Sequence, residues 1–375
     1  IVQMLYIHIP FCKSYCTYCS FFRTTSLDLK EKYVDTLCRE IDLRHDYLGK
    51  ISLDTIYFGG GTPSLLTADE LSKIFSAIGK YFTITDEAEI TIECNPDDVD
   101  ARFVTDLKHF PINRISIGIQ SFDDEQLRRL NRRHNRRQAV DCVCRLQDNG
   151  FDNISVDIIY SLPNQTLTSL NADIDQLLRL GVQHISAYSL TYERGTKLFD
   201  MWQRGKVEAI SDEDSKQLFD TLCYRLKNNG FEHYEISNFA LPHRRAVHNS
   251  GYWAGAKYLG IGTAAHSFDG SSRQWNPSDI DKYCLQIDRR RTFDEREMLT
   301  PTDRYNEFVF LSLRTVEGID TDRLASLFGS DARDYCMANA YKYIDAKLLK
   351  ITGNHLSLTH DGIFVSDGIM SSLMR

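Results

Sequence analysis

The sequence predicts an α/β fold with parallel strands, followed by a smaller helical region. Six short apolar runs between residues 5 and 190 alternate with amphipathic stretches, and the runs carry the β-branched residues typical of strands. Strands that alternate with helices form parallel βαβ units. Polar side chains gather where the apolar runs end, and proteins of this class place their sites at the carboxyl ends of the strands.

Composition narrows the class of protein further. A length of 375 residues suggests two domains, or one large domain with a small one. The net charge of −8 argues against a general nucleic-acid-binding surface. No apolar run approaches the roughly 18–20 residues that a membrane span needs. Ten cysteines without a signal-peptide pattern indicate a reducing compartment, so we expect a cytoplasmic protein that meets membranes through its partners.

The first predicted strand, residues 5–9, leads into a loop rich in cysteine. Pro10 ends the strand, because proline cannot donate a hydrogen bond to a β-ladder. Cys12, Cys16 and Cys19 follow with the spacing CxxxCxxC. The three thiols therefore lie on one loop just beyond a strand end, where a scaffold can present ligands.

Three thiolates on one short loop can hold a metal centre. Structural zinc takes four ligands, and a [4Fe–4S] cluster usually takes four cysteines. No fourth cysteine follows closely, because Ser20 and Phe21 come next. Either a remote residue completes the set, as in a zinc site that uses His8 or a distant cysteine, or one metal position stays open. An open position favours chemistry over a structural role.

The second strand, residues 53–58, is followed by the run Gly59-Gly60-Gly61-Thr62-Pro63. Glycines allow a ligand to approach the backbone closely and to meet its N–H and C=O groups. A tight turn between a strand and a helix, without a ligand, is the alternative interpretation of this run.

Four further strands complete the repeat. Glu93 and Gln120 lie at the ends of the third and fourth strands, and Arg132 lies in a polar corner after the fourth. Asp157 lies inside the apolar fifth strand, and because burying an unpaired carboxylate is costly, it needs a partner such as Arg132 or a ligand hydroxyl. These strands are expected at residues 89–94, 114–119, 154–160 and 184–190.

The stretches between the strands have helical periodicity. Thr67 and Glu70 form a capping-box pattern at the start of one of them. Helices are expected at residues 27–48, 67–81, 99–107, 123–130, 138–149, 167–180 and 211–229, with a strand at 231–236. Near the C-terminus we expect helices at 303–313, 321–328 and 331–346 and strands at 349–351 and 355–358. This order resembles a winged helix, but its mixed charge favours a cover or docking module over DNA binding.

The CxxxCxxC spacing, with Tyr18 just before the last cysteine, resembles the radical S-adenosylmethionine (radical SAM) superfamily. The oxygen-independent coproporphyrinogen oxidase-like branch is matched by further runs: YIHIPFCKSYCTYC, GGGTPSLL, EITIECNPD, ISIGIQSF, LNRRH, VDIIYSLPNQT and LGIGTAAHS. The resemblance implies a partial (β/α)6 TIM-like barrel over residues 1–240, a connecting segment over 241–299, and a C-terminal helical, winged-helix-like domain over 300–375.

The resemblance also implies two cofactors. Cys12, Cys16 and Cys19 would bind three irons of a [4Fe–4S] cluster, and the amine and carboxylate of SAM would chelate the fourth iron. The residues that the family pattern places around SAM are Tyr6, Tyr18, Gly60, Gly61, Thr62, Glu93, Gln120, Arg132 and Asp157.

Two subgroups of this branch differ near the cysteines. The dehydrogenase subgroup has another cysteine two residues after the third, and an N-terminal extension, whereas this sequence has Phe21 there and eleven residues before Cys12. The other subgroup, heme chaperones of the HemW type, carries an HNxxYW run, which is HNSGYW here. Histidine is a common heme ligand, although a structural histidine beside a core tryptophan is the alternative. Heme contacts are expected from His248, Tyr252, Trp253 and His266.

The resemblance therefore implies a heme chaperone that delivers heme to respiratory membrane proteins, with any catalysis uncertain. Oxidative decarboxylation of coproporphyrinogen III is the alternative from the same branch, and a radical SAM methyltransferase is a further one. A non-catalytic zinc protein is the fourth hypothesis. An electron donor for the cluster and a homodimer are both compatible with the resemblance.

Overall fold

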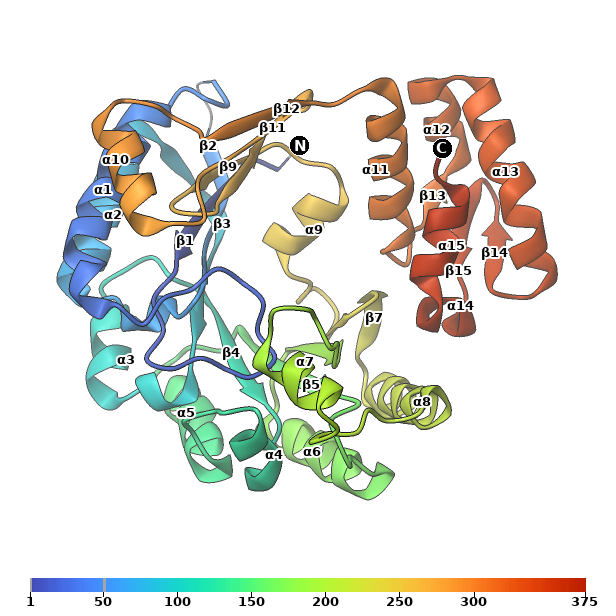
Figure 1. The fold of residues 1–375 in the computed structure, drawn as a ribbon, viewed down its shortest axis with the longest axis horizontal. Coiled ribbons are helices and arrows are strands. Elements are labelled where there is room, and N and C mark those ends of the chain that lie inside the picture. The colour runs from blue at the N-terminus through green and yellow to red at the C-terminus, as the bar shows by residue number, and fades with distance from the viewer. Residues whose placement is uncertain (1, 50–51) are drawn as a thin grey trace.

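The computed structural model of the chain describes residues 2–49 and 52–375. Residues 1, 50 and 51, which belong to the predicted range 1–240, lie outside the described part. Figure 1 shows two regions: strands surrounded by helices, and a separate group of helices near the C-terminus. The division of the chain at residues 240 and 300 stays a prediction.

The α/β fold with parallel strands is confirmed. Each of six strands pairs in parallel with the next one along the chain, so their spatial order is their sequence order. This is the arrangement of a (β/α) barrel that is open on one side. The strands are β1 (Met4–Ile9), β2 (Ser52–Gly60), β3 (Thr83–Cys94), β4 (Arg114–Gln120), β5 (Ile154–Tyr160) and β6 (His184–Ser189).

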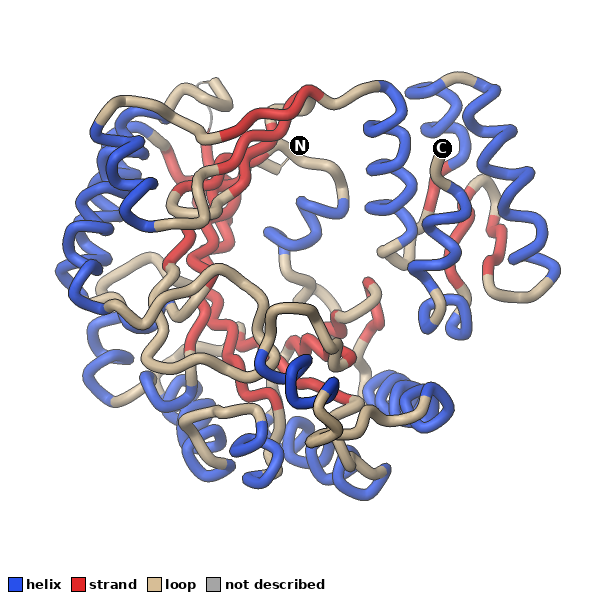
Figure 2. Tube along the Cα trace, in the orientation of Figure 1, coloured by secondary structure: helices blue, strands red, loops and turns tan. Residues whose placement is uncertain are grey.

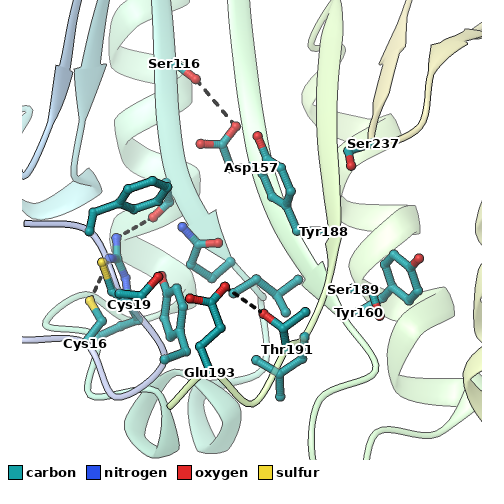
Figure 3. Close-up of a pocket in the computed structure, with 18 of the residues that line it drawn as sticks. Cys16, Cys19, Ser116, Asp157, Tyr160, Tyr188, Ser189, Thr191, Glu193 and Ser237 are labelled. Atoms are coloured by element: carbon teal, nitrogen blue, oxygen red, sulfur yellow. Dashed lines mark hydrogen bonds between the residues drawn. The ribbon is translucent and has the colours of Figure 1, made fainter. Parts of the chain in front are cut away.

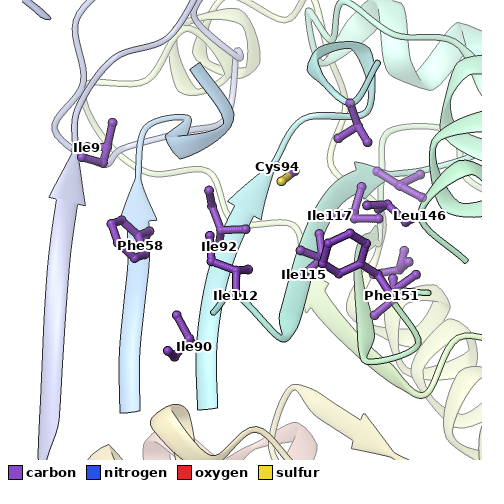
Figure 4. Packing of buried hydrophobic residues seen from close by; sticks show 14 of the residues in the cluster. Ile9, Phe58, Ile90, Ile92, Cys94, Ile112, Ile115, Ile117, Leu146 and Phe151 are labelled. Atoms are coloured by element: carbon purple, nitrogen blue, oxygen red, sulfur yellow. The ribbon is translucent and has the colours of Figure 1, made fainter. Parts of the chain in front are cut away.

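Helices cover the outer face of these strands (Figure 2). Alternate strand residues point to opposite faces, so apolar side chains such as Phe58, Ile92 and Ile117 pack outward while the polar ones point inward. Figure 4 shows these three side chains on successive strands, with Leu146 beside Ile117. Each such side chain, fully buried, contributes about 1.5–3 kcal/mol. The helices are α1 (Lys30–Arg44), α2 (Ala68–Tyr81), α3 (Ala101–Leu107), α4 (Asp124–Arg129), α5 (Arg136–Asp148) and α6 (Leu167–Leu180).

Local signals explain the helix boundaries. The predicted capping box is present: the Thr67 side chain accepts from the Glu70 backbone, and the Glu70 side chain accepts from the Thr67 backbone. Gly181 ends α6 with a left-handed conformation that glycine adopts readily. Two further helices, α7 (Lys197–Gln203) and α8 (Asp212–Asn228), follow β6. Of these two, α7 was not expected from the sequence.

Both edges of the six-stranded core are extended by short strands that the sequence pattern did not predict, apart from β7. On one side β9 (Tyr258–Ile261) pairs in parallel with β1, and β10 (His266–Phe268), β11 (Ser272–Trp275) and β12 (Glu295–Met298) add on antiparallel. On the other side β8 (Asn238–Ala240) pairs with β6, and β7 (Glu232–Glu235) pairs with β8. Strands of three or four residues are too short to show a period of two.

The HNSGYW run forms a short helix, α9 (Val247–Trp253), on the inner side of the sheet (Figure 1). It contacts β2 on one side and α11 of the C-terminal region on the other. The segment between α9 and the C-terminal region also contains α10 (Ile280–Asp288), which packs against α1.

The predicted C-terminal helical region is confirmed, and it has an apolar core of its own. It contains α11 (Pro301–Leu313), β13 (Ile319–Asp320), α12 (Thr321–Phe328), α13 (Ser330–Asp345), β14 (Leu349–Thr352) and β15 (His355–Leu358). Two short helices, α14 (His360–Phe364) and α15 (Ser366–Leu373), end the chain and were not predicted. Nowhere in the described parts of the chain is there a helix with the length and hydrophobicity to span a bilayer.

Candidate functional site

A cavity of about 960 Å³ lies at the carboxyl ends of the parallel strands. Its wall begins at the cysteine loop and continues over the ends of β3, β4, β5 and β6 to α8 and α14. Figure 3 shows Cys16 and Cys19 on one side of it, Tyr160 on the other, and Asp157 between them. The volume is at the upper end of the roughly 300–1,000 Å³ typical of ligand pockets.

All three predicted cysteines line this cavity. Backbone hydrogen bonds fix their loop at both ends: Cys12 N donates to Thr24 O at 2.9 Å, and Thr17 N donates to Leu130 O at 3.0 Å. Leu198 N, in α7, donates to Thr17 O at 2.8 Å. The first bond closes the loop on itself, and the other two hold it against the end of α4 and against α7.

The thiols have polar neighbours. Thr62 Oγ1 donates to Cys12 Sγ at 3.4 Å, and Arg132 Nη1 donates to Cys16 Sγ at 3.2 Å. Burial raises the pKa of the Cys12 and Cys19 thiols, so bound cations are needed to hold them as thiolates. Within residues 2–49 and 52–375 no three His, Cys, Asp or Glu side chains converge on one metal ion.

His8, the alternative zinc ligand, does not join the cysteines. Its Nδ1 lies 3.0 Å from Tyr6 OH, and its Nε2 lies 3.3 Å from Phe22 O. Burial lowers the pKa of His8 to about 4, so the ring stays neutral near pH 7. The ring therefore ties the cysteine loop to β1.

Steric crowding explains why glycine occupies two positions of the glycine run, and the sequence alone did not show this. Gly60 has φ +114°, and a Cβ added there would lie 2.6 Å from the His8 ring. A Cβ on Gly61 would lie 2.7 Å from the backbone of Pro10. Both glycines line the cavity, so they serve close packing of the cysteine loop and also expose backbone to a ligand.

Glu93 lies where the sequence placed it, at the end of β3 and on the cavity wall. Its Oε1 accepts from Tyr57 OH at 2.8 Å, and its Oε2 accepts from Gly60 N at 3.1 Å. Burial raises the pKa of Glu93 to about 7, and the negative charge of Asp157 adds to the rise, although the hydrogen bonds from Tyr57 and Gly60 oppose it. A cationic ligand would favour the ionised form.

Asp157 also faces the cavity, but the expected ion pair with Arg132 is not found among the described residues. Asp157 Oδ1 lies 3.5 Å from Ser116 Oγ instead (Figure 3). Burial raises the pKa of Asp157 to about 6. The prediction of an Arg132 partner was wrong, and the alternative, a ligand hydroxyl, stays open.

The Arg132 side chain is hydrogen-bonded to residues that line the cavity. Besides Cys16, it donates from Nη2 to Asn95 Oδ1 and to Gly118 O, both at 2.5 Å. Its Nε is buried and has no partner in the described structure. The side chain thus links the cysteine loop to the ends of β3 and β4.

Gln120 ends β4 in a strained conformation. Its φ is +74°, and the pairing of β4 with β5 shifts register between Gly118 and Gln120. Such a bulge re-aims a side chain at the end of a strand, and left-handed residues other than glycine gather at functional sites. Gln120 accordingly lines the cavity.

The two predicted tyrosines lie in different places. Tyr18 lines the cavity and packs with a small apolar cluster that includes Ile159 and Leu190. Tyr6 is absent from the described cavity wall and lies in an aromatic stack with Tyr57, 6.2 Å between ring centroids. Eight of the nine predicted SAM residues therefore meet one cavity: Tyr18, Gly60, Gly61, Thr62, Glu93, Gln120, Arg132 and Asp157.

The predicted heme residues lie elsewhere. His248 is 1% exposed, with Nδ1 2.8 Å from Thr55 Oγ1 and Nε2 3.1 Å from Tyr252 OH. Burial lowers the pKa of His248 to about 3. To bind iron in this conformation, the ring would have to give up one of its hydrogen bonds, so heme contact by His248 stays a prediction.

Trp253 and His266 do not belong to the hydrogen-bonded pair of His248 and Tyr252. The Arg314 guanidinium lies 4.4 Å from the Trp253 ring, and His266 stacks on Trp275 with centroids 5.5 Å apart. His266 is exposed. None of the four predicted heme residues belongs to the cavity wall in the described structure.

Sequence analysis missed part of the wall. Arg314 follows α11 in a region that we expected to be a cover. Ile363 and Phe364 end α14, and Val365 lies between α14 and α15. Tyr188 lies on β6, where its position near a strand end was the one available signal.

Two family models match the chain. The model described as the radical SAM superfamily matches residues 6–177, and the model described as the HemN C-terminal domain matches residues 299–365. The first match spans β1 to β5 of the barrel, and the second spans most of the C-terminal helical region.

Curated relatives match the chain over nearly its whole length. Proteins of Lactococcus lactis subsp. lactis (strain IL1403) and Bacillus subtilis (strain 168), both named heme chaperone HemW, are each 30% identical. The first match covers 98% of this chain and 96% of the relative, and the second covers 100% and 99%. A Danio rerio protein named radical S-adenosyl methionine domain-containing protein 1, mitochondrial, is 30% identical over 99% of this chain and 86% of its own length.

One solved structure shares the whole fold. The coproporphyrinogen III oxidase HemN from Escherichia coli, described as a radical SAM enzyme, has a TM-score of 0.87 and 21% identity. The match covers 100% of this chain and 90% of that chain. At this identity the likeness shows a common fold.

Proposed function

The chain belongs to the radical SAM superfamily and, within it, to the family of its HemW relatives, and from this premise we propose that it is a heme chaperone. The relatives that support this proposal are matched end to end, and the expected resemblance to the radical SAM superfamily is confirmed. Phe21 is the observation that favours the heme chaperone subgroup over the dehydrogenase subgroup. This side chain is 69% exposed and lines the cavity at the position where the dehydrogenase subgroup has a cysteine.

The proposal includes a [4Fe–4S] cluster on Cys12, Cys16 and Cys19. The thiols fit such a cluster because all three line one cavity and follow the CxxxCxxC spacing on one loop. When bound, the cluster can supply one electron to the sulfonium of SAM. Arg132, which donates to Cys16, favours the thiolate form of that ligand.

SAM is proposed to lie between the cysteine loop and the ends of β3 to β5. Glu93 would accept from its amine, as it accepts from Gly60 N and Tyr57 OH. Asp157, which lacks the expected arginine partner, would accept from a ribose hydroxyl. Tyr18 and its apolar cluster would offer a flat face to the adenine.

Heme is the cargo in this proposal, and respiratory membrane proteins are its recipients. We place the protein in the cytoplasm, with an electron donor for the cluster and a homodimer as further parts of the proposal. Whether SAM is cleaved is a separate question, because an intact SAM site serves both binding and cleavage.

An anaerobic heme titration of the cluster-reconstituted protein tests the proposal. We expect stoichiometric uptake with an altered Soret band and no conversion of coproporphyrinogen to protoporphyrinogen. Tyr224→Ala is the matched control, because this tyrosine is 70% exposed on α8, and unchanged uptake in that variant would show that heme is not adsorbed to this surface ring. Absent heme uptake together with porphyrinogen turnover would overturn the proposal and favour the dehydrogenase.

A further inference from the structure

The cavity extends beyond the predicted SAM residues into a second part, here called the distal lobe. The Tyr160 and Phe364 rings lie 6.1 and 6.0 Å from the Phe219 ring, and Ile236 N donates to Arg314 O at 3.0 Å. Aromatic and aliphatic side chains from the barrel and the C-terminal region thus meet here, and Arg314 adds a guanidinium to them. The distal lobe is defined by Tyr160, Phe219, Ile236, Arg314, Ile363 and Phe364.

Arg314 is held in place by two neighbours. Its Nη2 donates to Glu235 Oε2 at 3.3 Å, and its guanidinium carbon lies 4.4 Å from the Trp253 ring centroid. The Glu235 side chain is 0% exposed and that of Arg314 is 20% exposed, so the accessible part of this pair is the guanidinium. Arginine has five donors, and here Nε is buried without a partner in the described structure.

We propose that the distal lobe binds the cargo heme and that Arg314 pairs with one of its propionate carboxylates. This inference rests on the proposed function and names the site within it. A flat apolar macrocycle suits aromatic and aliphatic walls, and a guanidinium binds a carboxylate through two parallel hydrogen bonds. Asp212 and Asp367, the acidic residues on this side of the cavity wall, are exposed at its rim and would repel a carboxylate there.

The same geometry gives the HNSGYW helix a role without direct heme contact. Trp253 ends that helix and lies against Arg314, while His248 and Tyr252 are hydrogen-bonded to each other. Trp253 is therefore a positioning residue that orients the guanidinium toward the distal lobe. The cation–π contact is worth about 0.5–2 kcal/mol, enough to select one side-chain orientation.

The test compares two ligands on the same reconstituted protein: iron protoporphyrin IX and its dimethyl ester, which lacks both carboxylate charges. We expect the wild type to bind the free acid about tenfold more tightly than the ester, because a charge-assisted hydrogen bond is lost with the ester. Equal affinities would overturn this inference and leave the proposed function standing. Absence of binding to either ligand would overturn both.

Variants locate the effect. Replacing Arg314 alone would leave the Glu235 carboxylate buried and unpaired, so the test variant is the double substitution Arg314→Gln with Glu235→Gln. It should bind acid and ester equally, whereas Arg333→Gln, on the exposed surface of α13, should keep the tenfold preference. Trp253→Leu should reduce the preference, and Trp253→Phe should retain it because the ring face remains. A double variant that keeps the wild-type preference, with an unchanged melting temperature, would overturn the role of Arg314.

Discussion

The cysteine loop and the HNSGYW helix both carry predicted ligand residues, but the structure uses them differently. The loop follows a parallel strand, and its three cysteines reach the same cavity as the ends of β3, β4 and β5. The helix lies inside the barrel, and the hydrogen bonds of His248 are made to protein groups. A motif at the carboxyl end of a strand thus points to its site through topology alone, whereas a motif on an inner helix acquires its meaning from what packs around it.

The largest effect should come from removing one thiol of the loop. Cys16→Ala should lose nearly all iron and sulfide after reconstitution, because two cysteines do not hold the cluster. Iron, sulfide and visible absorption provide the measurement. Cys144→Ala is the matched control on exposed α5 surface, and His248→Ala should also keep its iron. Full iron content in Cys16→Ala would break the comparison, because the loop would then not be the cluster site.

The second effect separates the packing role of the glycine run from ligand binding. Gly60→Ala should destabilise the protein by about 3 kcal/mol, from a positive φ and a Cβ that meets the His8 ring. Gly79→Ala is the control: this glycine lies in α2 with open space around its Cα, so alanine should stabilise by about 0.5–1 kcal/mol. Urea unfolding of both variants measures the difference. A neutral Gly60→Ala would show that the His8 ring can move away from β2 without loss of stability.

The sequence predicted the barrel well because its signals are local. Apolar runs, a capping box and chain order are enough to place β1 to β6, and parallel topology then brings Glu93, Gln120 and Asp157 to one edge. The same reasoning predicted a site at the carboxyl ends of the strands. It did not predict how far the cavity extends from there.

The missing parts depend on long-range packing. Arg314 reaches the cavity because residues 314–316 bond to the backbone of β7, about eighty positions earlier in the chain. The predicted partner of Asp157 was wrong because Arg132 donates its hydrogen bonds to Cys16, Asn95 and Gly118 instead. No periodicity in the sequence indicates such long-range contacts, so the distal lobe could not be predicted from the sequence.

A third effect tests whether His248 is a structural residue. His248→Ala should lower the free energy of unfolding by about 2 kcal/mol, since it leaves Thr55 and Tyr252 without their partner. Heme affinity, measured below the melting transition, should stay near that of the wild type. His109→Ala, on an exposed turn, is the control for stability. Loss of heme binding with unchanged stability would reverse the comparison and make His248 a ligand.

The smallest effect is a pH dependence that should appear in the cavity and be absent from the inner helix. Burial raises the pKa of Glu93 to about 7, so its ionised fraction grows from about one tenth at pH 6 to about nine tenths at pH 8. The ionised carboxylate attracts the SAM amine, so SAM affinity should rise about tenfold over this range. Calorimetry on the reconstituted protein measures it.

Variants assign that pH dependence to one group. Glu93→Gln should bind SAM more weakly and should lose most of the rise in affinity between pH 6 and pH 8, because its amide does not titrate. Asp157, with a pKa near 6, contributes mainly below pH 7, and its share should remain in that variant. His248 has a pKa near 3 and is neutral throughout, so His248→Ala should keep the full wild-type slope. A slope that survives in Glu93→Gln and vanishes in His248→Ala would move the titrating group from the strand ends to the inner helix.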